Sequence, residues 1–321
     1  MSALDEMEEQ WAAALVLPPA VEERPFVLRY EFTQAVAFLR ALHPLCEWWH
    51  DERARWIFRG HADAAWPLLP SAHRASAMRA FGRRLAVDLP NVDEFSRVAH
   101  EVALLAAFYR AADQQGLPVH VRQLSTEDWS NFREMGRPAS AAWWPPVDMV
   151  PLMALAQHHG VPTRLLDWSW SPFAAAYFAA QEPSPAGAPS LAVWALSSAL
   201  ITGAVATSRG FGCRVVSAPR WTNPNLHAQA GVFTCVRNAT DELNPLDVTA
   251  SQIAEVLAKR GELGRPFVRK LVLPRTEANR LALGLRRQGV SALTLFPGFQ
   301  GVVEDLLAHA RLSADWGLVD D

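Results

Sequence analysis

The segment from residue 148 to 181, DMVPLMALAQHHGVPTRLLDWSWSPFAAAYFAAQ, constrains the fold more than any other stretch of the 321-residue chain. Its first part predicts an apolar helix that ends at Gly160 and that Pro162 prevents from continuing. TRLLDW then predicts a short strand. Ser171 is a helix cap and Pro172 a first helical residue, and they open a second helix rich in alanine. Two helices and a strand therefore follow one another with almost no connecting chain.

The rest of the chain predicts helices mainly in its first half and strands mainly in its second half. This order favours the α+β class over a regular alternation of strands and helices, although it does not predict the order of the strands. We predict an N-terminal helical arm over residues 1–30 and one domain over residues 31–321. Further helices are predicted at TQAVAFLRALHP, residues 92–115, STEDWSNFREMG, VTASQIAEVLAKRG, TEANRLALGLRRQG and the C-terminal end, and strands at RWIFRG, LAVWAL, CRVVSA, GVFTCV and FVRKLVL.

Composition narrows the functional classes. Half of the residues are hydrophobic and the net charge is −3, so no overall basic field indicates nucleic acid or a membrane surface as a partner. The three cysteines are scattered, so neither a disulfide framework nor a cysteine-based metal site is expected. The acidic N-terminus is not a signal peptide, and no apolar run is long enough to cross a bilayer. We expect a cytoplasmic protein.

Three short stretches carry the candidate chemistry, because the usual nucleotide-binding, hydrolase and zinc motifs are absent from the sequence. The first is Arg59-Gly60, where a charged donor ends a predicted strand beside a glycine. The second runs from residue 158 to 178, and the third is HAQAGVF at residues 227–233. Glycine in the first and third lets the main chain approach a ligand closely. In the second, the N-terminus of a helix favours an anion.

These motifs resemble those of the FRG-domain family. The residues that carry the resemblance are FRG, LPSAHR and LMALAQHHGVPTRLLDWSWSPFAAAYFAA, which together span roughly residues 30 to 180. The closing LTLFPGFQGVVEDL is also similar to the C-terminal end of that family. Mild departures occur at His61, His159 and Ser169, where glutamine, tyrosine and threonine are more usual.

The motif order is in turn similar to that of ADP-ribosyltransferases, which bind NAD as a substrate in the cleft of a split β-sheet. The resemblance implies that fold here, with NAD and an unknown macromolecular acceptor as partners and no metal. It implies that Arg59 grips a phosphate of NAD bidentately, with Gly60 leaving room for it. The residues that would contact NAD are then Arg59, Gly60, Arg74, His158, Thr163, Arg164, Tyr177 and Phe178.

Three residues are candidates for catalysis: Arg59 and Gln229 by the same resemblance, and Asp167 as a further acid. Gln229 would hold a ribose hydroxyl and orient the sugar. The chain departs from the family pattern here, because it has Gln229 and no Glu-x-Glu, and a glutamine cannot serve as a general base. Either the acceptor supplies its own activation, or an acid such as Asp167 or Glu304 contributes. The implied activity is transfer of ADP-ribose or hydrolysis of NAD, for which toxin action or phage defence is a setting that the sequence does not select.

Simpler interpretations stay open beside this one. Arg59 could pair structurally with a carboxylate such as Asp63 or Asp167, since a charge at the end of a buried strand needs a partner. The protein could instead be a non-catalytic module that recognises a nucleotide or a nucleic-acid end through Arg59, Arg164 and its tryptophans. A protein-interaction domain with a purely structural arginine–aspartate network is the third alternative. The sequence does not predict the oligomeric state.

Overall fold

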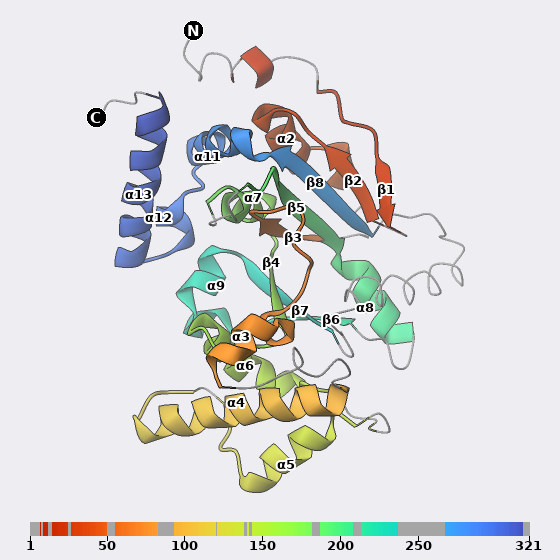
Figure 1. Cartoon of the computed structure of the whole chain (residues 1–321), viewed down its shortest axis with the longest axis vertical. Helices are drawn as coiled ribbons and strands as arrows, with labels where there is room; N and C mark the ends of the chain where they lie inside the picture. Colours follow the sequence, from red (N-terminus) through yellow and green to blue (C-terminus); the bar gives the residue numbers. More distant parts are fainter. Residues whose placement is uncertain are drawn as a thin grey trace.

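A computed structural model of the chain is shown in Figure 1. The structure describes residues 7, 9–11, 15–24, 27–49, 55–82, 93–119, 121–137, 140, 143–181, 187–207, 213–236 and 267–316. Within these residues, no helix combines the length and the apolar character that crossing a membrane requires.

The described strands form one eight-stranded sheet in the order β1-β2-β8-β5-β3-β4-β7-β6. Their bounds are Val21–Arg24 (β1), Val27–Glu31 (β2), Trp56–His61 (β3), Leu165–Ser169 (β4), Ser190–Ser197 (β5), Cys213–Val216 (β6), Gly231–Val236 (β7) and Val268–Pro274 (β8). Only β2 and β8 run parallel among these neighbours, and every other neighbouring pair is antiparallel.

The sheet nearly parts between β3 and β4. These two strands share a single residue pair, Phe58 with Ser169, whereas β3 and β5 share six pairs and β4 and β7 share five. Two half-sheets result, one of β1, β2, β8, β5 and β3, the other of β4, β7 and β6. Strands and helices are not regularly alternated along the chain, so the α+β prediction is confirmed.

Helices cover both half-sheets. The α-helices are Ala35–Leu42 (α2), Ala75–Ala80 (α3), Glu94–Gln114 (α4), Thr126–Glu134 (α5), Val150–His158 (α6), Pro172–Gln181 (α7), Ser198–Thr207 (α8), Pro224–Ala228 (α9), Ala278–Arg287 (α11), Ala292–Leu295 (α12) and Phe299–Trp316 (α13). Short 3₁₀ helices lie at Glu47–Trp49, Ser71–His73, Val147–Met149, Arg220–Thr222 and Arg275–Glu277. The first half-sheet packs on α2, α7 and α11, and the second shares a core with α4, α5 and α6 (Figure 1).

Gly60 is required by the packing of α7 on β3. A Cβ atom at this position would lie 2.0 Å from the carbonyl oxygen of Ala175 and 2.6 Å from the backbone nitrogen of Ala179. No side chain can occupy that space, because both contacts are with the helix backbone. The glycine therefore lets α7 approach the sheet, and its predicted role in leaving room for a ligand stays a prediction. At Gly231 an added Cβ would lie 2.3 Å from Cδ1 of Leu226 in α9, so this glycine accommodates the leucine side chain.

Several local predictions are confirmed. The structure has α2, β3, α6, β4 and α7 where the sequence predicts them. The predicted helix at STEDWSNFREMG is α5, and Ser125 and Asp128 form a capping box at its start. The long helix α4 is also present. Its N-cap is Asp93, whose side chain accepts a hydrogen bond from the backbone nitrogen of Ser96. The predicted helix VTASQIAEVLAKRG lies outside the described residues.

The predicted N-terminal helical arm over residues 1–30 is corrected at its second half. Residues 21–24 and 27–31 are strands β1 and β2, which form one edge of the sheet. The partner of β2 is β8, about 240 residues away, and Val27 pairs with Val268. This part of the chain therefore belongs to the main sheet and is no separate arm.

Candidate functional site

A cleft of about 780 Å³ opens where the two half-sheets part. It is lined by residues of β3, β4, α6, α7, α9 and α13. These segments lie far apart in the sequence. In Figure 1, β3, β4, α7 and α9 lie near the centre of the molecule, and α13 lies at its edge. The volume is within the range of small-molecule sites.

Arg59 is fixed on the cleft wall by two neighbours. Its Nε donates to Nε2 of His61 at 3.0 Å, and its Nη1 donates to the backbone carbonyl of Asp167 at 2.8 Å. The Asp167 carboxylate lies 3.7 Å from the same Nη1, and the Arg59 side chain is 18 % exposed. Of the two carboxylates that the sequence leaves open as partners, Arg59 therefore pairs with Asp167. The guanidinium is held in one orientation at the edge of the cleft.

His61 supports this orientation as a neutral acceptor. Its side chain is buried, and burial followed by the charge of Arg59 lowers the pKa of His61 to about 2. The ring is therefore uncharged at neutral pH. Since Nε2 accepts from Arg59, the ring proton is on Nδ1.

The stability of the protein should therefore fall below about pH 6.5. Between pH 6.5 and about 2, an unfolded His61 binds a proton that the folded protein excludes, so the free energy of unfolding decreases as the pH is lowered. The slope from this residue reaches about 1.4 kcal/mol per pH unit. His61→Gln keeps an acceptor for Arg59 but does not titrate, so urea unfolding of the variant should depend less on pH between 6.5 and about 5. Equal slopes for the two proteins would contradict the buried neutral state.

Asp167 is oriented by a chain of hydrogen bonds that begins at a residue outside the cleft. Thr163 is buried, and its hydroxyl donates to Oε1 of Gln157. The amide of Gln157 then donates from Nε2 to Oδ1 of Asp167 at 2.7 Å. Thr163 is itself held by Ser71, whose Oγ accepts from its backbone nitrogen at 3.1 Å. The prediction that Thr163 lines the cleft is therefore corrected: it acts on the cleft through Gln157.

Arg164 does not line the cleft either. Its side chain is fully buried and points two donors at the carboxylate of Glu101, from Nε and Nη2, both at 2.8 Å. Nη1 donates to Glu94 at 2.7 Å. The reason is that α4 presents two glutamates to the start of β4, and a buried guanidinium requires such partners. Arg164 is a structural residue that joins α4 to the second half-sheet.

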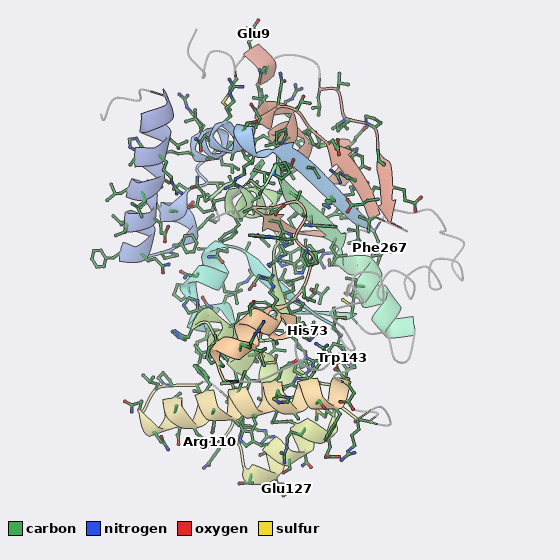
Figure 2. The ribbon with its side chains drawn as sticks, in the orientation of Figure 1. Glu9, His73, Arg110, Glu127, Trp143 and Phe267 are labelled. Atoms are coloured by element: carbon green, nitrogen blue, oxygen red, sulfur yellow. The ribbon has the colours of Figure 1, made fainter. Side chains whose placement is uncertain are left out.

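Glu101 is the centre of this buried network. It also accepts a hydrogen bond from Nε1 of Trp144 at 3.2 Å and lies 3.7 Å from His73. Burial alone would raise the pKa of Glu101, but Arg164 and His73 outweigh it and hold the pKa at about 2. Figure 2 shows His73 beside α3, on the side of the fold where α4 packs.

Most of the other predicted residues line the cleft, and one of them does not. The cleft is lined by Gly60, His158, Tyr177, Phe178 and Gln229, together with Arg59 and Asp167. Arg74 is absent from the lining, because its Nε turns back to the carbonyl of Leu69 at 3.0 Å. This corrects its prediction as an NAD contact.

Two lining residues have protonation states set by burial. Burial, and then the neighbouring charge of Glu304, raise the pKa of Tyr177 to about 12, so its hydroxyl stays protonated and can donate a hydrogen bond. Burial, followed by its neighbour His159, lowers the pKa of His158. Gln229 is anchored by its own side chain, whose Nε2 donates to the carbonyl of Leu295 at 3.2 Å. The cleft therefore combines amide and phenol groups and two histidines with one arginine and two carboxylates, Asp167 and Glu304.

Sequence reasoning missed part of the lining. The missed polar residues include Gln157, His159, Gln181, Asn223, Asn225 and Gln300. Asn223 carried a local signal, because it precedes a proline and caps α9 by accepting from the backbone of Leu226. The others carry no such signal, since polar residues on helices are usually solvated. Among the described residues, no group of three or more histidine, cysteine or acidic side chains is placed to hold a metal ion.

The sequence model of one protein family, the FRG domain, matches residues 54–187. The chain carries an FRG domain. Its matched segment runs from β3 to just beyond α7, so the FRG domain supplies Arg59, Asp167 and Tyr177 to the cleft. The opposite wall, from α9 and α13, lies outside the matched segment. No curated protein and no solved structure matches the chain.

Proposed function

We propose that this FRG-domain protein is an NAD-binding, ADP-ribosyltransferase-like enzyme that transfers ADP-ribose to a macromolecular acceptor or hydrolyses NAD. The observation that carries the proposal is the convergence of Arg59, Asp167 and Gln229 on one cleft. The three residues come from β3, β4 and the end of α9, and the cleft lies at the line where the sheet parts. A cleft between two half-sheets is the type of site that the resemblance to ADP-ribosyltransferases implies.

The lining suits the parts of NAD. The oriented guanidinium of Arg59 offers a charged donor to the pyrophosphate. Tyr177, Phe178 and Phe296 supply aromatic surface on which a planar ring can pack. Gln229 supplies an amide for a ribose hydroxyl.

The carboxylates suit the reaction. In the proposed step, the bond between ribose C1′ and nicotinamide breaks, nicotinamide leaves with the electron pair, and positive charge develops on the sugar. Asp167 has a side chain that is 63 % exposed and is oriented by Gln157, so it can stabilise this charge. Water or the acceptor then forms the new bond to C1′, and Asp167 or Glu304 takes the proton of the attacking group.

A module that recognises nucleic acid is less well supported. Its proposed contacts include Arg164, which is fully buried among glutamates. The tryptophans Trp143, Trp144 and Trp168 are also buried and offer no stacking surface, whereas Trp170 is half-buried and Trp221 is 76 % exposed.

The proposal is tested by mixing the purified protein with NAD and measuring heat of binding and release of nicotinamide. We expect saturable binding, and we expect Gln229→Ala to weaken binding or slow release about tenfold because one hydrogen bond to the ribose is lost. Gln115→Ala, at an exposed position after α4, is the matched control and should behave as wild type. No binding and no nicotinamide at millimolar NAD would reject the proposal.

A further inference from the structure

Helix α13 presents an unusually apolar face to solvent. The large side chains on this face are exposed by 92 % at Phe299, 42 % at Val302, 56 % at Val303, 66 % at Leu306 and 57 % at Leu307. They recur at helical spacing over about 12 Å of the helix axis. Figure 1 shows α13 at one edge of the molecule, with α11 and α12 on its inner side. An apolar patch of this kind marks an interaction surface.

The pattern on α13 fits a second helix of the same kind. Val303, Leu306 and Ala310 recur at alternating spacings of three and four residues, which is the pattern that packs one helix along another. The opposite face is already occupied, since Ala308 and Leu312 are buried against the protein. A helix that is apolar on both faces needs a second partner to cover the outer one.

We propose that the outer face of α13 binds α13 of a second copy of this chain, antiparallel, about a two-fold axis near Leu307. The charges beside this face are complementary to those of a second copy of α13, and this favours a second copy as the partner. Glu304 and Arg311 lie on the same flank of the face, seven residues apart and symmetric about residues 307 and 308. Because a two-fold axis between antiparallel helices keeps each flank on its own side, Glu304 of each copy meets Arg311 of the other. Two symmetric ion pairs then border an apolar centre formed by Leu306 and Leu307.

The same flank of α13 borders the cleft. Gln300 and Glu304 line the cleft, and Arg311 donates to Oε1 of Gln181, another lining residue. The two-fold axis keeps these flanks on one side, so both clefts of the dimer open in the same direction. A single helix pair buries less than the roughly 1,600 Å² of a standard interface, so we expect a dissociation constant on the order of 10 µM.

Sedimentation velocity of the full chain over a range of micromolar concentrations tests the association. Wild type is expected to shift from monomer to dimer, and Leu307→Glu is expected to raise the dissociation constant at least tenfold by placing a charge in the apolar centre. Leu117→Glu is the matched control, because this leucine is 59 % exposed and follows α4, away from α13. A monomer at every concentration, or a dimer that Leu307→Glu leaves intact, overturns the proposal.

A charge exchange tests the antiparallel register. Glu304→Arg alone and Arg311→Glu alone should each weaken the dimer, since like charges then face each other across the axis. The double variant Glu304→Arg with Arg311→Glu should recover most of the affinity. Thermal unfolding of each variant checks that the fold is intact. Failure of the double variant to recover, with both single variants folded and weakened, rules out the proposed register.

Discussion

Replacing Arg164 by methionine is expected to lower the free energy of unfolding by about 3–5 kcal/mol. The variant removes the three donors that Arg164 supplies to Glu101 and Glu94, and it leaves the Glu101 carboxylate buried without its main partner. An uncompensated buried charge lowers the free energy of unfolding far more than the loss of a small packing contact does. Urea unfolding, followed by circular dichroism, measures the change.

A second substitution separates the charge effect from packing. If the loss arises from the stranded carboxylate, the double variant Arg164→Met with Glu101→Leu should be less destabilised than the two single variants added together. Arg122→Met, which breaks only the exposed ion pair with Asp128, serves as the control and should change stability little. Strict additivity of the two buried substitutions would show that Arg164 and Glu101 do not act as a pair.

Replacing Arg59 by alanine is expected to reduce NAD affinity, or kcat/KM for nicotinamide release, about 100-fold. The variant removes the charged donor that the proposed site offers to the pyrophosphate, and hydrogen bonds to charged groups contribute about 1.5–3 kcal/mol. Arg59→Lys keeps the charge but loses the planar fork that His61 and Asp167 orient, so its loss should be intermediate. Calorimetric titration with NAD and a nicotinamide assay measure both effects.

The matched control for Arg59 is Arg74→Ala. Arg74 is a nearby arginine that does not line the cleft, and its side chain bonds the carbonyl of Leu69. Its replacement should leave NAD affinity within about twofold of wild type. Equal behaviour of the Arg59 and Arg74 variants, with both folded, would remove Arg59 from the proposed site.

Local signals were sufficient for much of the secondary structure. Gly160, Pro162 and the Ser171-Pro172 pair act within a few residues of themselves, so the boundaries of α6 and α7 could be read from the chain directly. The same holds for the capping box of α5. The cleft residues Arg59 and Asp167 were also predictable, because a charge within an apolar strand must meet a partner or a ligand.

The errors arose where distant residues decide the outcome. Arg164 lies between Thr163 and an apolar strand, and nothing local shows that Glu101, 63 residues earlier, would bury it. The N-terminal strands were missed because β2 is defined by its parallel partner β8, near the other end of the chain. The packing role of Gly60 is not predictable from the sequence, because the approach of Ala175 depends on the tertiary structure.

The single residue pair Phe58–Ser169 makes the contact between β3 and β4 the weakest strand pairing described in the sheet. Elsewhere, neighbouring strands are joined by ladders such as the seven pairs of β5 and β8, which resist bending as a unit. At this one joint, few hydrogen bonds oppose a rotation of one half-sheet against the other. Side chains of both half-sheets, among them Ile57 of β3, Trp168 of β4 and Val232 of β7, share one hydrophobic core here, so side-chain packing rather than backbone pairing joins the two halves.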